Sequence, residues 1–253
     1  YERDEQLGGQ LRLAAAVPSR AGVFALVPHL EHEARRLGVE IRTGAEITPG
    51  CFADVAADAD AVILATGARP LAPAFEQDGS VELMTVWGVL GGGRVDGKRA
   101  VVADDGTGFW EAVSAAELLG DAGLSVALAT PARSVGAAIP FESIGPLLRR
   151  LGQRRVTLYP LVHVNGIRDG SVALVHALTG DPLELPADSV VVHAGTVSND
   201  GLAGLPAESG AIVRTIGDCV SPRRLTHANW DADRTVLELM RTDSRPEPTP
   251  RAW

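Results

Sequence analysis

A strand, a glycine turn, a helix and a second strand follow one another in this chain, and this pattern constrains its fold most. Residues 99–103 are a short apolar run typical of a buried parallel strand, and Gly106 and Gly108 lie in the turn after it. The pattern then predicts a helix over 109–119 and a strand over 124–129. Such a unit is the first half of a mononucleotide-binding fold. The sequence therefore predicts an α/β protein.

Composition and charge exclude several classes of protein. The chain has 253 residues, 45% of them hydrophobic, which suffices for a sizeable core. It carries 23 Lys and Arg against 32 Asp and Glu, so no nucleic-acid partner is expected, because phosphate binding is mainly an effect of Lys and Arg. No apolar run approaches the length of a membrane span. Cys51 and Cys219 are too few for a disulfide framework or a metal cluster, so we expect a cytoplasmic protein without a metal site.

The rest of the chain reads as further helices and strands. A helix is predicted over 19–37, in which Pro28 either causes a kink or takes the first position of a shorter helix. Residues 39–42 alternate like a half-buried strand, and 61–65 form an unbroken apolar run typical of a central parallel strand. The other predicted elements are helices at 144–151 and 225–241, strands at 189–193 and 212–216, and β-like runs at 156–159, 162–167 and 172–177 with hairpin turns at 169–170 and 179–181.

Three short stretches carry candidate ligand-binding residues, and the first contains Glu2 and the pair Gly8-Gly9. In a dinucleotide-binding unit, an acidic residue after the second strand accepts hydrogen bonds from the ribose hydroxyls. A carboxylate suits this task because both of its oxygens are acceptors. Taken alone, Glu2 is better explained as a solvated residue at a chain end, and the glycine pair as an ordinary turn.

The other two stretches each follow a predicted strand. Residues 65–70 read Ala-Thr-Gly-Ala-Arg-Pro, in which Gly67 lets the backbone approach a ligand closely. Residues 215–219 read Thr-Ile-Gly-Asp-Cys, in which Asp218 can accept a hydrogen bond from a sugar hydroxyl and turn amides can meet pyrophosphate. A strand end and a Gly-Asp turn are common structural features. The order of the three stretches along the chain is what points to a nucleotide.

In this order the stretches resemble the FAD-binding segments of flavoproteins with two dinucleotide-binding folds. More narrowly, the runs 8–11 (GGQL), 104–108 (DDGTG) and 217–223 (GDCVSPR) resemble the C-terminal regions of old-yellow-enzyme-like oxidoreductases. This group holds trimethylamine dehydrogenase, histamine dehydrogenase and 2,4-dienoyl-CoA reductase. The resemblance extends from Tyr1 to Leu239.

The resemblance implies two interleaved Rossmann-like nucleotide-binding units. A FAD/ADP-binding-type domain would use residues 1–96 and 197–253, and an NAD(P)H-type domain would be inserted at 97–196. FAD or ADP is expected in the outer domain, whereas FMN, a 4Fe–4S cluster and the reaction itself belong to a preceding barrel domain in the family. The implied cofactor-binding residues are Glu2 and Arg3 at the adenosine ribose, Gly8, Gly9, Gln10, Ala65, Thr66 and Gly67 along the cleft, and Gly217 and Asp218 at the pyrophosphate or ribityl end. No catalytic residue is assigned.

The chain departs from the family pattern in two places. The first strand and its glycine-rich loop, expected about 25–30 residues before the ribose-binding carboxylate, are not in the sequence. The chain is therefore expected to be a fragment that binds nucleotide weakly or not at all. In the inserted domain, the fingerprint glycines would fall at Thr107, Phe109 and Ala112. Asp104 and Asp105 add negative charge where pyrophosphate would lie, so NAD(P)H is not expected there.

These features predict a fragment of a flavin-dependent oxidoreductase, inactive alone. The whole protein is expected to contain the barrel, to form homo-oligomers and to pass electrons to an acceptor protein. A non-catalytic role stays open, in which the region binds ADP or nothing and serves as a scaffold or docking domain. A pyridine-nucleotide-disulfide reductase relative is a further alternative, although the sequence has no Cys-x-x-Cys pair. Cys219 is interpreted as structural.

Overall fold

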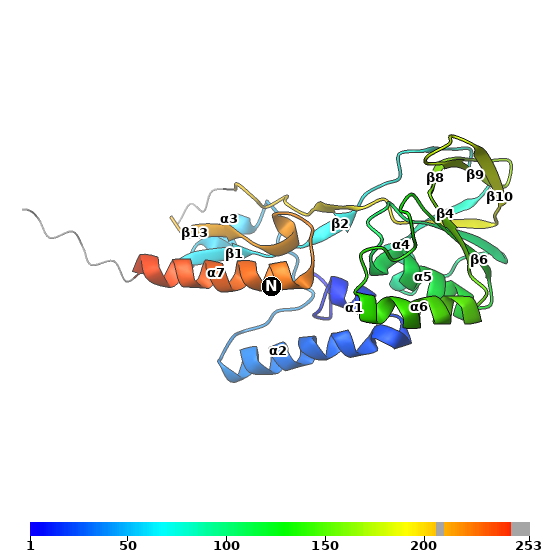
Figure 1. Ribbon diagram of the computed structural model, residues 1–253. Helices are drawn as coiled ribbons and strands as arrows, with labels where there is room; N and C mark the ends of the chain where they lie inside the picture. The colour runs from blue at the N-terminus through cyan, green and yellow to red at the C-terminus, as the bar shows by residue number, and fades with distance from the viewer. Residues whose placement is uncertain (206–209, 244–253) are drawn as a thin grey trace, which may run out of the picture. The chain divides into compact units, whose positions relative to one another are not determined.

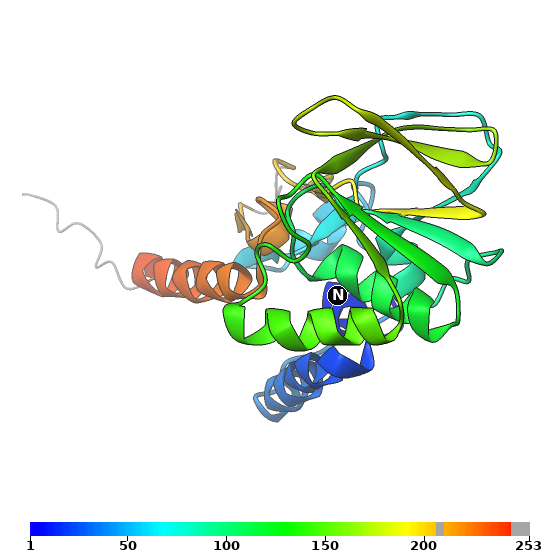
Figure 2. The same ribbon diagram turned by 45° about the vertical axis from the view of Figure 1, so that its right-hand side comes forward.

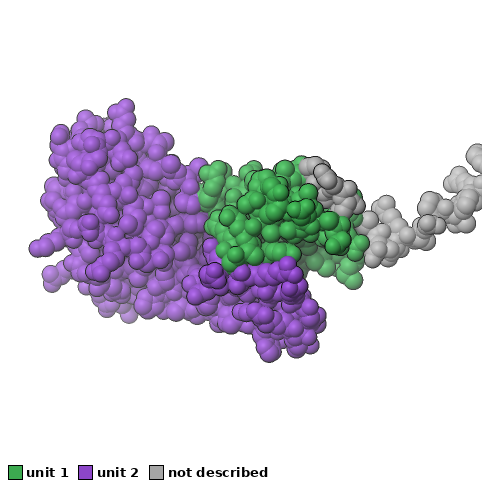
Figure 3. Space-filling model, turned by 180° about the vertical axis from the view of Figure 1, so that it is seen from behind, with its two compact units in different colours: residues 1–3, 44–69, 196–253 green, residues 4–43, 70–195 purple. Residues whose placement is uncertain are grey.

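The computed structural model describes residues 1–205 and 210–243 and divides the chain into two compact units, coloured separately in Figure 3. Both units contain parallel strands and helices, so the predicted α/β class is confirmed. The assignment of 1–96 with 197–253 and of 97–196 to two nucleotide-binding domains stays a prediction. The described residues of unit 1 lie within 1–3, 44–69 and 196–253, and unit 2 consists of residues 4–43 and 70–195.

A five-stranded parallel sheet lies at the centre of unit 2. Its strand order is β4 (Glu82–Thr85), β11 (Ser189–Val192), β5 (Arg99–Ala103), β6 (Ser125–Thr130) and β7 (Thr157–Pro160). The predicted strand–turn–helix–strand unit is present as β5, α5 (Trp110–Asp121) and β6. From β5 the chain continues to β6 and β7 on one side, whereas β11 lies on the other. The sheet thus has a switch point between β5 and β11, where ligands bind in folds of this type.

Both faces of this sheet are covered, as Figures 1 and 2 show. Ala100 and Val102 of β5 pack with residues of α5, α4 (Val86–Leu90) and α6 (Phe141–Gln153). Their neighbours Val101 and Ala103 point the other way and pack against a second sheet, because successive side chains of a strand alternate between its faces. These four residues of β5 are at most 5% exposed.

The second sheet has the order β10 (Pro182–Pro186), β9 (Ser171–His176), β8 (Val162–Arg168) and β3 (Glu76–Gln77). The two predicted hairpins are confirmed, because β8–β9 and β9–β10 pair antiparallel. Asp169 and Gly170, with φ of 51° and 73°, form the first turn, which needs positive φ at both central positions. The β-like run at 156–159 instead becomes β7 and pairs parallel with β6.

The N-terminal helices of unit 2 are α1 (Gln10–Ala14), the 3₁₀ helix η1 (Pro18–Ala25) and α2 (Leu26–Arg36). Of the two alternatives for Pro28, the structure is close to the one that places it at the start of a shorter helix, because Pro28 is the third residue of α2. The missing N–H of proline leaves no bond unmade in a first helical turn.

The predicted strand at 39–42 is wrong, because these residues have no strand structure. Val39 is 53% exposed, and none of the described strands pairs with this segment. An alternating sequence supplies an apolar side for burial, but a strand forms only where a neighbour accepts its backbone hydrogen bonds.

Unit 1 contains a parallel pair of strands, β1 (Ala61–Leu64) and β13 (Ile212–Thr215). Its helices are α3 (Phe52–Ala56), the 3₁₀ turn η2 (Gly217–Cys219) and α7 (Leu225–Asp243). The predicted central strand is an edge strand among the described residues, because β1 pairs only with β13 and Ile63 is 41% exposed. Where the chain passes between the units, β2 (Ala68–Pro70) pairs with β12 (Thr196–Ser198). None of the described helices is both long and apolar enough to cross a membrane.

One buried carboxylate joins three helices of unit 2. Glu117 of α5 is 2% exposed. Its Oε1 lies 2.7 Å from Nε of Arg150 in α6 and 3.6 Å from Nη2 of Arg154, the residue directly after α6. Its Oε2 accepts a hydrogen bond from Oγ of Ser19 in η1 at 3.3 Å. A charge so deeply buried is tolerated only when it is paired in this way.

Glu117→Ala is expected to lower the free energy of unfolding by about 2–4 kcal/mol, because two arginines lose the charge that balances them. Glu142→Ala, at an exposed position in the first turn of α6, is the control and costs a few tenths of a kcal/mol at most. Urea unfolding followed by circular dichroism measures both. Equal effects of the two variants would contradict the role of the buried pair.

Candidate functional site

Two of the predicted stretches meet at the carboxyl ends of β1 and β13. The main-chain N–H of Ile216 donates to the carbonyl oxygen of Leu64 at 2.9 Å, which extends the strand pair by one step. Just beyond it, Oγ1 of Thr66 lies 3.0 Å from Sγ of Cys219. The structure therefore brings Ala65–Gly67 beside Gly217–Cys219, although Thr66 and Cys219 are 153 residues apart in sequence.

A residue that sequence reasoning missed, Asn199, fixes the first of these turns. Its main-chain N–H donates to the carbonyl of Gly67 at 2.9 Å, and its Nδ2 donates to the carbonyl of Thr66 at 3.2 Å. In return, the hydroxyl of Thr66 lies 2.5 Å from the carbonyl oxygen of Asn199. A single Asn in a distant loop carries no signal in the sequence, since its partner is known only once β12 is paired with β2. Cys219 is 3% exposed, consistent with the structural role expected for it.

The second turn is tight and polar. Gly217 has φ of 63°, and a Cβ added to it would lie 3.4 Å from Cβ of Ala228 on α7. Its main-chain N–H donates to Oδ2 of Asp231 at 3.2 Å. The next residue, Asp218, accepts a hydrogen bond at Oδ1 from the main-chain N–H of Arg223 at 2.9 Å. Glycine is therefore favoured here by the positive φ of the turn, whereas a Cβ would meet Ala228 only at ordinary contact distance.

The remaining predicted binding residues lie elsewhere. Glu2 and Arg3 belong to unit 1, where the carbonyl oxygen of Glu2 accepts a hydrogen bond from the main-chain N–H of Ala45 at 2.9 Å. Gly8, Gly9 and Gln10 belong to unit 2, in which Gln10 is the first residue of α1. A Cβ on Gly8 would lie 3.0 Å from the ring of Phe24, so this glycine has a packing role within its own unit. The ligand-binding roles of all these residues stay predictions.

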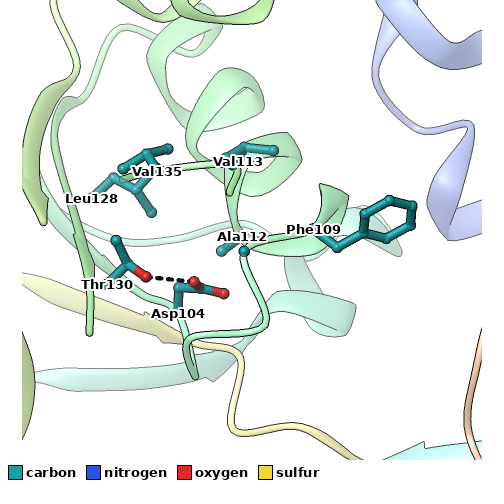
Figure 4. A pocket seen from close by; sticks show the side chains of 9 residues that line it. Asp104, Phe109, Ala112, Val113, Leu128, Thr130 and Val135 are labelled. Atoms are coloured by element: carbon teal, nitrogen blue, oxygen red, sulfur yellow. Dashed lines mark hydrogen bonds between the residues drawn. The ribbon is translucent and has the colours of Figure 1, made fainter. Parts of the chain in front are cut away.

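The switch point of unit 2 is lined by a carboxylate and by closely packed side chains. Asp104 follows β5 directly, and its Oδ2 accepts a hydrogen bond from Oγ1 of Thr130, the last residue of β6, at 2.7 Å (Figure 4). Between these residues and α5 the side chains pack so closely that no space is left for a water molecule, and the ring of Phe109 points away from them. Ligand pockets have volumes of roughly 300–1,000 Å³, so this closely packed region has no room for a dinucleotide.

The connection after β6 occupies the turn in which a pyrophosphate would lie. The carbonyl oxygen of Gly108 accepts a hydrogen bond from the main-chain N–H of Ala138 at 2.9 Å. A Cβ on Gly108 would lie 3.0 Å from the nitrogen of Ala137, and a Cβ on Gly106 would lie 2.9 Å from Cγ of Pro131. The space beside Gly106 and Gly108 is thus filled by the chain's own backbone and side chains, which leaves no room for a phosphate.

Electrostatics at this switch point also oppose an anion. Burial raises the pKa of Asp104 above its ordinary value, and neighbouring Asp105 adds to this effect. The hydrogen bond from Thr130 and the positive charge of a protonated His193 act in the opposite direction. His193 is 7% exposed, and its Nε2 lies 3.7 Å from Oδ2 of Asp105. Two carboxylates and a filled turn do not fit the pyrophosphate of NAD(P)H.

The described residues contain no group of three or more His, Cys, Asp or Glu side chains placed to hold a metal ion. Among them, the turns at the ends of β1 and β13 are the better candidate for a nucleotide. They combine a hydrogen-bonded carboxylate with a glycine that excludes any side chain.

No protein-family model matches the chain. Comparison with individual proteins does find relatives. It is 28% identical to an N,N-dimethylglycine/sarcosine dehydrogenase of Chromohalobacter salexigens, over 94% of this chain and 40% of the relative. It is 30% identical to a multifunctional alkene reductase/demethylase of Caballeronia cordobensis, over 94% of this chain and 39% of the relative. The chain thus spans about two-fifths of the length of these relatives.

Solved structures agree on the fold. Histamine dehydrogenase from Rhizobium sp. 4-9 superposes with a TM-score of 0.83 and 22% identity, covering 99% of this chain and 41% of that one. Thioredoxin reductase of Lactococcus lactis gives a TM-score of 0.65 and 18% identity, covering 95% of this chain and 88% of that one. The fold is therefore that of the FAD/NAD(P)-binding Rossmann-like domains of oxidoreductases. The relatives that the chain matches over about two-fifths of their length are named as dehydrogenases, demethylases and reductases, in agreement with the resemblance found in the sequence.

Asp104→Asn is expected to raise the free energy of unfolding near pH 7. At that pH the carboxylate is charged in both states, and burial disfavours the charged form only in the folded state. Below the ordinary carboxyl pKa the side chain is protonated in both states, so the gain disappears. Urea unfolding across this pH range tests it, with exposed Asp96→Asn as the control. A gain that persists in acid would contradict the assigned cause.

Gly217→Ala is expected to lower the free energy of unfolding by about 1–2 kcal/mol, because a positive φ is costly for any residue with a Cβ. Gly201→Ala is the matched control in the same unit, since its φ is not positive and a Cβ there meets nothing within 4 Å. Thermal unfolding compares the two. Equal stability would show that the turn can relax.

Proposed function

We propose that this chain is the nucleotide-binding region of a flavin-dependent oxidoreductase and that unit 1 holds FAD or ADP. The observation that carries the proposal is the meeting of Ala65–Gly67 with Gly217–Cys219 at the carboxyl ends of two parallel strands. Ligands of open α/β sheets bind at this end of the strands. The relatives' names support the reaction class, since they are dehydrogenases, demethylases and reductases.

The proposed roles follow the chemistry of each group. Glu2, with Arg3 beside it, would accept hydrogen bonds from the ribose hydroxyls. Asp218 would accept hydrogen bonds from the sugar-alcohol hydroxyls, and main-chain amides of the turn would meet the pyrophosphate, because Gly217 keeps side chains away from the ligand backbone. FAD, when bound, supplies hydride and electron transfer; this chain's own residues bind and orient it, and none is proposed as a catalyst. FMN, the iron–sulfur cluster, the substrate and the barrel are proposed for the remainder of the whole protein.

A second candidate is a scaffold that keeps ADP permanently bound, or nothing. The filled turn around Gly106 and Gly108 favours it, because a relay from NAD(P)H would need an open site in unit 2. The same feature favours a dehydrogenase that passes electrons to an acceptor protein over a reductase fed by nicotinamide. Cytoplasmic location and homo-oligomers are proposed on the resemblance alone.

Acid extraction of the complete gene product, with chromatography of the released compounds, is the test. FAD beside FMN is expected for an electron-carrying unit 1, and ADP beside FMN for the scaffold. FMN with no adenine nucleotide would overturn the proposal.

Asp218→Asn is expected to lower the bound adenine nucleotide per protein in the same assay, because a neutral amide replaces a charged acceptor. The loss corresponds to roughly tenfold weaker binding. Asp233→Asn, at an exposed position of α7, is the control and is expected to keep the wild-type ratio. An unchanged ratio in Asp218→Asn would remove Asp218 from the site.

A further inference from the structure

We infer that Asp231 of α7 is the positioning residue for the loop 217–223, the second half of the proposed nucleotide site. This inference rests on the proposed function for what the loop binds. The placement of Asp231 itself rests on contacts within unit 1.

A single carboxylate oxygen of Asp231 ties the two ends of the loop together. Oδ2 accepts the main-chain N–H of Gly217, the first residue of the loop, at 3.2 Å. The same oxygen accepts Nη2 of Arg223, the last residue of the loop, at 2.5 Å. The loop is thereby closed through one side chain of a neighbouring helix.

Arg223 links Asp231 to Asp218. Its guanidinium binds Asp231, while its main-chain N–H donates to Oδ1 of Asp218 at 2.9 Å. Its Nε donates to the carbonyl oxygen of Ser221 at 3.2 Å, inside the loop. The rotamer of Asp218 is therefore set by a backbone position that depends on Asp231. On the far side of the loop, Cys219 holds the other turn through Thr66.

Burying the charged side chain of Asp231 costs free energy, so a role in stability alone does not explain why a carboxylate stands here. Asp231 is 7% exposed, and its second oxygen is bound by Arg234, whose side chain is 70% exposed and contributes little. A buried ion pair is often no more stabilising than apolar residues of the same volume. An apolar residue could fasten α7 to the strands, but it could not accept the N–H of Gly217. The carboxylate of Asp231 thus fixes the conformation of the loop 217–223.

The experiment uses the complete gene product, four single variants and one double variant. Asp231→Ala removes both bonds to Oδ2, and Asp231→Asn keeps an acceptor for Gly217 but removes the charge. Arg223→Gln removes the other partner, and Asp233→Asn is the exposed control on the same helix. Two quantities are measured: the rate at which bound adenine nucleotide is lost on dilution, and the amide hydrogen exchange of residues 217–223.

Asp231→Ala is expected to release nucleotide about tenfold faster or more, with faster exchange confined to residues 217–223. The double variant Asp231→Asn with Arg223→Gln is expected to release it no faster than the more affected single variant, because both act through one loop. If Asp231→Ala does not fold, Asp231→Asn and Arg223→Gln provide the same two readouts.

Three results would overturn the inference: wild-type release rates in both Asp231 variants, slower release because a repulsive charge has gone, or unchanged exchange at 217–223. Failure of the proposed function looks different. The wild-type protein would then contain no adenine nucleotide, and hydrogen exchange alone would decide whether Asp231 positions the loop.

Discussion

The structure depends on one requirement of parallel sheets, that both faces be covered. Unit 2 meets it fully, since Ala100 and Val102 of β5 face helices while Val101 and Ala103 face the second sheet. The described residues of unit 1 contain one parallel pair of strands, β1 and β13, and a small core, and polar bonds from Asn199 and Asp231 hold its turns. The contrast explains why the candidate site of unit 1 is built from side chains of distant segments.

The carboxyl ends of the parallel strands differ between the two units. In unit 1, the turns after β1 and β13 lie side by side, and glycine keeps one of them clear of side chains. In unit 2, the connection after β6 packs into the glycine turn, and Asp104 takes the place of an anion-binding group. A fold that offers binding positions does not oblige each of them to bind.

Sequence patterns predicted the elements that depend on local signals. The strand–turn–helix–strand unit and the hairpin at Asp169-Gly170 follow from apolar runs and turn chemistry, and both are present. The strand at 39–42 failed because pairing needs a neighbour that no local pattern reveals. Proximity of Thr66 and Cys219 followed from the strand order of a known fold, whereas the roles of Asn199 and Asp231 depend on side-chain directions that only the three-dimensional structure supplies.

The unpaired side of β1 has a practical consequence. A strand edge with open backbone groups is a template for any extended peptide, and natural proteins shield such edges with charge, proline or a covering segment. Among the described residues, β1 pairs with β13 on one side only, and its Ile63 is 41% exposed. We therefore expect this edge to be the place at which the chain, handled by itself, would pair with a second copy.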